Sequence, residues 1–160
     1  MRRYLELYHC NPMRFGESRV HVCPYPGECM TTVLIIDDSI DYLHGVSELL
    51  DAVGYCVVLT VEPQRALELC HEVDFDLILC ALELREHASV GTLSTQVGIR
   101  TLLSLLKNNP TVPIVATGAL LSEEVLNEME RMGIREALPK HLSHSALLRN
   151  ISRLIGGATA

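Results

Sequence analysis

Two adjacent carboxylates, one hydroxyl and one ammonium group each follow a short apolar run in this sequence. The carboxylates belong to Asp37 and Asp38, the hydroxyl to Thr117 and the ammonium group to Lys140. Carboxylate oxygens suit Mg²⁺, while a cation and a hydroxyl can hold the anionic oxygens of a phosphoryl group. Brought together, the four side chains would form a phosphoryl or divalent-cation site. Taken singly, each also has a structural explanation, since Asp often precedes a helix and Thr suits a strand.

Apolar runs alternate with amphipathic segments from Thr31 onward, and this pattern decides where the four side chains lie. Strands are expected at 33–38, 55–60, 76–84, 112–118 and 137–140. One helix is expected to end near Val53 and the next to begin at Pro63, and three more are expected at about 98–107, 122–133 and 143–154. The strands are apolar throughout, which indicates a parallel sheet covered on both faces. Right-handed crossovers then predict an open doubly wound sheet, whose chemistry lies at the carboxyl ends of its strands.

Four segments carry a resemblance to a known family. VLIIDDS, DLILCALEL, VPIVATGA and EALPKHL follow one another in that order. Over about residues 31–155 the chain resembles the receiver domain of bacterial two-component response regulators. The resemblance implies a flavodoxin-like (βα)5 fold, with five parallel strands in the order 2-1-3-4-5 and helices on both faces.

The resemblance also implies roles for single residues. In that family an acidic pair binds Mg²⁺, an Asp ending the third strand accepts a phosphoryl group from a histidine kinase, and a Thr or Ser and a Lys contact it. Asp37 and Asp38 match the pair, Thr117 the hydroxyl and Lys140 the lysine, but Ala81 stands at the acceptor position. A methyl group is no nucleophile, so we expect no phosphoryl transfer, weakened Mg²⁺ binding and no required cofactor. Lys140 is then free to pair with Asp37 or Asp38.

Other positions bear on this match. A shift of two residues would place Glu83 on the same strand face as Ala81, but Asp76 leads the strand and favours the unshifted match. The aromatic residue that many receivers carry before the lysine falls at Ala137. His141 replaces the proline that usually follows the lysine, which puts the family's cis peptide in doubt.

The segment 85–98 is longer than this loop usually is in receivers. Two interpretations stay open, a tolerated surface insertion and a loop that covers the site or docks a partner. His87 within it is expected to lie in solvent.

These features predict a signalling protein that acts by protein contact, not an enzyme. Only GGATA follows Ile155, so a single domain is expected to act through a protein partner, a histidine kinase or a downstream regulator. The resemblance also implies that the face of the fourth helix, fifth strand and fifth helix can form a homodimer or bind a partner, as it often does in receivers. The apolar side chains of that face, which suit a core equally well, are Leu126, Met129, Leu147 and Leu148.

Two alternatives remain. The first is a conventional phospho-accepting receiver in which Ala81 is an introduced change, or which is phosphorylated elsewhere. The second, less favoured, is an enzyme on the same sheet. IDDSID lacks the glycines of a dinucleotide-binding turn, and Cys80 is expected to be buried in mid-strand, where thiols are inert.

Length and charge further narrow the classes of protein to which this chain can belong. A chain of 160 residues forms one ordinary domain, and its formal charge of -7 without a basic stripe argues against nucleic-acid binding. No apolar run is long enough for a membrane span and the start lacks a signal peptide, so a cytoplasmic location is expected.

Three segments are expected along the chain. Residues 1–30 form an irregular tail, which would be a mis-assigned leader if Met30 is the natural start; residues 31–156 form the receiver-like domain and residues 157–160 a flexible C-terminus. The tail contains metal-ligand types whose spacing is a weak match to a zinc site. They are His9, Cys10, His21, Cys23 and Cys29, while the other cysteines, Cys56, Cys70 and Cys80, are expected to pack in the core.

Overall fold

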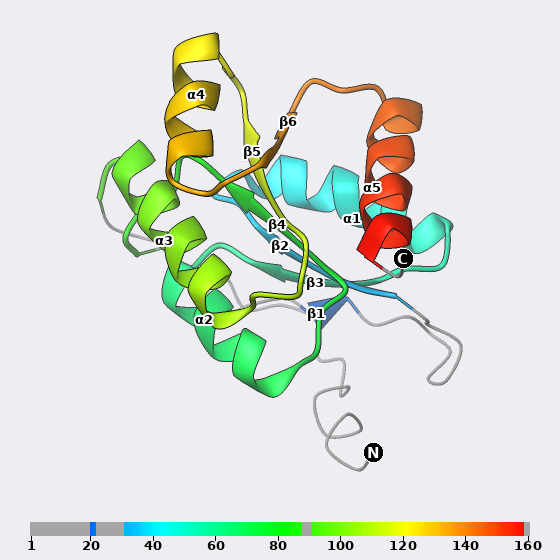
Figure 1. Cartoon of the computed structure of the whole chain (residues 1–160). Coiled ribbons are helices and arrows are strands. Elements are labelled where there is room, and N and C mark those ends of the chain that lie inside the picture. The colour runs from blue at the N-terminus through cyan, green and yellow to red at the C-terminus, as the bar shows by residue number, and fades with distance from the viewer. Residues whose placement is uncertain (1–19, 22–30, 88–90, 159–160) are drawn as a thin grey trace.

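The computed structural model describes residues 20–21, 31–87 and 91–158 as strands alternating with helices (Figure 1). The elements are β1 (Val20–His21), β2 (Thr32–Ile36), α1 (Ile40–Ala52), β3 (Cys56–Thr60), α2 (Pro63–Glu72), β4 (Leu77–Ala81), α3 (Thr95–Asn108), β5 (Ile114–Gly118), α4 (Glu123–Arg131), β6 (Glu136–Pro139) and α5 (His144–Ala158). Among the described residues, no helix is both long and apolar enough to cross a membrane.

The sheet has the predicted topology with one addition. Its order is β1-β3-β2-β4-β5-β6, and the five strands from β2 to β6 run parallel, which confirms the doubly wound order 2-1-3-4-5. β1 pairs antiparallel with the outer edge of β3. The prediction of a wholly irregular tail is therefore wrong at Val20–His21, because an unpaired strand edge offers backbone groups that a neighbouring segment can bond. The other residues of the weak zinc match, His9, Cys10, Cys23 and Cys29, lie outside the described residues.

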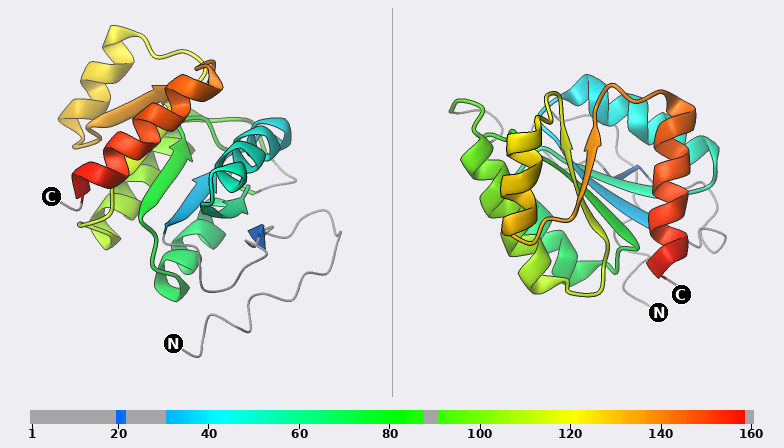
Figure 2. Two further views of the ribbon diagram at one scale, coloured as in Figure 1. Left: turned by 90° about the vertical axis from the view of Figure 1, so that its right-hand side faces the viewer. Right: turned by 45° about the horizontal axis from the view of Figure 1, so that its top comes forward.

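Helices cover both faces of the sheet, as Figure 2 shows from two further directions. One core lies under α2, α3 and α4, and a second core lies under α1 and α5. In β2, Leu34 and Ile36 enter the first core while Val33 and Ile35 enter the second. A strand buried on both sides has no polar alternation, which explains the continuous apolar runs of the sequence.

Two helix boundaries differ from expectation. α3 begins at Thr95, three residues before the expected start at 98, because the hydroxyl of Ser94 accepts a hydrogen bond from the amide of Gln96 at 3.2 Å and caps the helix. α5 continues to Ala158, so residues 157 and 158 are helical, where a flexible C-terminus was expected. No proline interrupts the helix there.

The cysteines differ from one another. Cys80 is fully buried, and Cys70 is half-buried; both are free. Cys56 is disulfide-bonded, so its prediction as a free packing residue is wrong.

Candidate functional site

Ala81 is the last residue of β4 and lies at the centre of the carboxyl edge of the sheet. In the strand register it pairs with Thr117 of β5. On the other side, Cys80 pairs with Ile36, so Asp37 follows at the level of Ala81. The side chains of Ala81, Thr117 and Asp37 are all buried. The fold therefore brings together three of the positions that the sequence analysis selected.

Asp37 is the most enclosed acid of the site. Its side chain is 1 % exposed, and its Oδ1 accepts a hydrogen bond from the amide of Ser39 at 2.8 Å. Its Oδ2 receives no hydrogen bond of good geometry but lies 2.6 Å from Nζ of Lys140. A buried carboxylate needs such a partner, since an unpaired charge is costly to remove from water. This ion pair confirms the expected contact between Lys140 and the acidic pair.

Lys140 reaches the pocket from the end of β6. Its amide donates a hydrogen bond to the carbonyl of Gly118 at 2.9 Å, which continues the strand pairing and fixes the start of the side chain. Its ammonium nitrogen also lies 5.1 Å from the ring centre of Tyr42, within range of a cation–π contact. Burial, together with the nearby Asp37 carboxylate, raises the pKa of Tyr42 to about 12. Tyr42 thus stays a neutral phenol beside the ion pair.

Asp38 pairs with a different basic side chain, Arg85, which the sequence analysis did not select. Its side chain is 8 % exposed and forms an ion pair with Nη1 of Arg85. The pKa of Asp38 is raised, chiefly by burial and also by the negative charge of Asp37. The positive charges of Arg85 and Lys140 oppose this rise. Arg85 is the first residue of the unusually long segment 85–98. A basic residue so close after the end of the third strand was the sequence signal that could have indicated a partner for the acidic pair.

The family model for the response regulator receiver domain matches residues 33–152, which include every residue of this pocket. The chain belongs to the response regulator receiver family. The transcriptional regulatory protein ZraR of Escherichia coli K12 is 29% identical over 123 residues, which cover 77% of this chain but 26% of ZraR. The chain thus spans about a quarter of that relative's length.

Solved structures agree with this assignment. A two-component response regulator from Clostridium difficile superposes with a TM-score of 0.70 at 19% identity, over 82% of this chain and 100% of that one. The chemotaxis protein CheY4 of Vibrio cholerae superposes with a TM-score of 0.66 at 25% identity, over 79% of this chain and 99% of that one.

Ala81 is the residue that the sequence analysis matched to the acceptor position of the family. The register supports the unshifted match, because Ala81 pairs with Thr117 while Glu83 lies two residues beyond the end of β4 and is exposed. Ala137 is half-buried and His141 exposed, and every peptide bond of the described residues is trans. His87 is exposed, as expected.

The receiver residues do not fit a divalent cation. Mg²⁺ takes oxygen ligands in octahedral geometry, but the methyl group of Ala81 supplies none and each carboxylate of the acidic pair already has a cationic partner. In the part of the chain that the structure describes, no three His, Cys, Asp or Glu side chains are grouped to hold a metal ion. Cys80 is buried, as expected, and its burial raises the pKa of the thiol.

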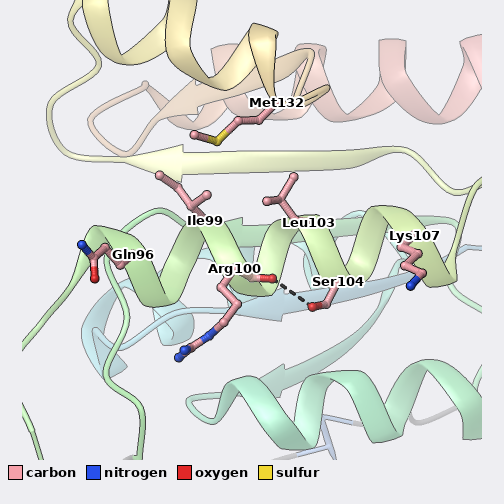
Figure 3. Close-up of a pocket in the computed structure, with 7 residues that line it drawn as sticks. All are labelled: Gln96, Ile99, Arg100, Leu103, Ser104, Lys107 and Met132. Carbon is pink, nitrogen blue, oxygen red and sulfur yellow. Dashed lines mark hydrogen bonds between the residues drawn. The ribbon is translucent and has the colours of Figure 1, made fainter.

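The receiver domain also has a groove beside α3. Its volume is about 460 Å³, and Figure 3 shows Ile99 and Leu103 pointing from α3 towards Met132, which follows α4. Arg100 and Lys107 of α3 complete its polar border. No side chain of the acidic pocket lines this groove.

Proposed function

We propose that this receiver domain transmits a signal by protein contact and does not accept a phosphoryl group at the usual position. The observation that carries the proposal is the position of Ala81 between Asp37 and Thr117, where the sequence match expects the acceptor. A methyl group has no lone pair with which to form a bond to phosphorus. Every other polar group of the family's site is retained around it.

The ion pairs support a pocket that needs no phosphoryl group. In a phospho-accepting receiver, Lys140 would have the acceptor carboxylate and the phosphoryl group as anionic partners. Here its ammonium group lies 2.6 Å from Oδ2 of Asp37. A partner would therefore meet one arrangement of the pocket, whatever the activity of a kinase.

The proposed partner is another protein of two-component signalling in the cytoplasm, either a histidine kinase or a downstream regulator. The similarity to a protein named as a transcriptional regulator supports the second of these. No enzymatic activity, required cofactor or nucleic-acid contact is proposed.

A second copy of the chain was expected to contact the face of α4, β6 and α5. Met129 and Leu147 of that face are buried in the two cores, so they are not available to a partner. Leu126 of α4 is 39% exposed, and Leu148 of α5 is half-buried. A homodimer through this face remains a proposal, and it would depend on Leu126. Leu126→Glu should then shift the sedimentation coefficient towards that of a monomer, while an unchanged value excludes this face.

The test of the main proposal is exposure to a small-molecule phosphodonor with Mg²⁺. We expect no acid-labile phosphoryl group on the unmodified protein, measured by intact-mass spectrometry at neutral pH. Ala81→Asp, run beside it, restores the carboxylate. A phosphoryl group on the unmodified protein would overturn the proposal, and peptide mapping would then identify another acceptor, with Glu83 the first position to inspect.

A further inference from the structure

Arg85 places a positive charge beside the acidic pair, where receivers of this family bind a divalent cation. Its guanidinium pairs with Asp38, whose side chain is 8 % exposed, while its own side chain is 37 % exposed. Ordinary surface ion pairs join two solvated groups and contribute little. Here the acid is largely removed from water, so it depends on this partner.

The backbone on either side holds Arg85 in place. The buried Leu84 precedes it and forms an isolated antiparallel bridge with Ser94, the N-cap of α3. The amide of Ser94 donates to the carbonyl of Leu84 at 2.9 Å, and the amide of Leu84 donates to the carbonyl of Ser94 at 3.3 Å. The guanidinium therefore extends from a closed loop base, and the ion pair joins that base to the segment between β2 and α1.

The charges of the pocket balance without a metal ion. Asp37 and Asp38 carry two negative charges, and Lys140 and Arg85 carry two positive charges in direct contact with them. A divalent cation would have to displace one or both partners or add two uncompensated charges. Either change costs free energy in a pocket of low dielectric constant.

We propose that the Arg85 guanidinium replaces the divalent cation of this receiver domain and fixes the loop after β4 against the acidic pair. This inference rests on the proposed function, because a pocket without an acceptor has no use for an exchangeable metal ion. Arginine side chains stay protonated in proteins, so the contact persists where a bound metal ion would exchange. Arg85 and the bridge between Leu84 and Ser94 are thereby held in one arrangement that neither chelators nor Mg²⁺ concentration alters.

The experiment measures Mn²⁺ binding by electron paramagnetic resonance, since Mn²⁺ prefers the same carboxylate ligands as Mg²⁺. The proteins are the unmodified chain, Arg85→Gln, and Arg100→Gln as the matched control. Arg100 also pairs with a glutamate of this loop, Glu86, but both of those side chains are exposed and lie outside the pocket. We expect Arg85→Gln to bind Mn²⁺ about tenfold or more tightly than the other two, which corresponds to about 1.4 kcal/mol.

A second pair places the same change in the Ala81→Asp background. There, Arg85→Gln should again strengthen Mn²⁺ binding, and Asp38→Asn should abolish the gain in either background. Equal Mn²⁺ affinity of Arg85→Gln and Arg100→Gln in the unmodified chain overturns the inference. That comparison does not depend on whether Ala81→Asp folds, and circular dichroism verifies the single variants.

Failure of this inference is distinguishable from failure of the proposed function. A phosphoryl group on the unmodified protein contradicts the function, whereas equal Mn²⁺ affinities contradict only the role of Arg85. A further readout needs no metal ion, because amide hydrogen exchange at Leu84 and Ser94 should accelerate in Arg85→Gln and not in Arg100→Gln. Unchanged exchange in Arg85→Gln contradicts the fixing of the loop.

Discussion

The ammonium nitrogen of Lys140 lies 2.6 Å from Oδ2 of Asp37, and this ion pair joins the end of β6 to the end of β2. Ala81 lies at the end of β4, in the strand between β2 and β5. The methyl group of Ala81 carries no charge. The ammonium group of Lys140 therefore pairs with the carboxylate of Asp37, at the end of β2. The ammonium group is thus neutralised by a direct contact between groups that lie on either side of β4.

Removal of the Lys140 charge should destabilise the fold. Lys140→Met retains most of the apolar stem but leaves the buried Asp37 carboxylate without its partner. We expect the free energy of unfolding, measured by urea denaturation, to fall by about 3 kcal/mol. The double variant Lys140→Met/Asp37→Asn should recover most of this loss, because asparagine carries no charge and its carbonyl can still accept from Ser39.

An exposed ion pair provides the control for that measurement. Arg153 of α5 pairs with Glu136 of β6 at 3.2 Å, and both side chains are solvated. Arg153→Met should therefore change the free energy of unfolding by less than about 1 kcal/mol. Equal losses in Lys140→Met and Arg153→Met would show that the Asp37 contact has no special role.

Gly98 should tolerate no side chain. A Cβ atom built at this position of α3 would lie 1.8 Å from the carbonyl oxygen of Leu82, just after β4. Gly98→Ala must therefore push the helix away from the strand end, and we expect a loss of about 3 kcal/mol in urea denaturation. Gly45→Ala in α1 is the matched control, because a Cβ atom there meets nothing within 4 Å. It should gain about 0.5–1 kcal/mol, since alanine favours the helix.

The sequence predicted most of the fold because strand burial and strand order have strong local signals. The apolar run of β4 and the acids after β2 place Ala81 beside Asp37 without any knowledge of tertiary contacts. Arg85 was missed for a physical reason, since a single arginine in a long loop is most often solvated. Its pairing with Asp38 depends on the bridge between Leu84 and Ser94, which no local pattern indicates. The pairing of β1 likewise depends on a contact distant in sequence.

Tyr42 should ionise late in an alkaline titration. Burial and the Asp37 carboxylate raise its pKa from 10.0 to about 12. Between these values the unfolded chain loses the phenol proton while the folded chain retains it, so the contribution of Tyr42 to stability falls as the pH rises through this window. Absorbance of the phenolate near 295 nm should show a late phase that Tyr42→Phe removes. An unaltered titration in that variant would contradict the buried position of the ring.

The two free cysteines among the described residues, Cys70 and Cys80, should differ in alkylation at pH 8. Burial raises the pKa of Cys70 from 9.0 to about 11, and its half-buried thiol should react about 100-fold more slowly than a solvated thiol because the thiolate fraction falls with the pKa. Cys80 is fully enclosed in β4, and burial raises its pKa as well. Mass spectrometry of peptides after iodoacetamide treatment should find Cys80 unmodified until urea unfolds the protein. Rapid modification of Cys80 in the folded state would instead indicate an accessible nucleophile next to Ala81. That outcome would favour the alternative of an enzyme on this sheet, against which the burial of the thiol argues.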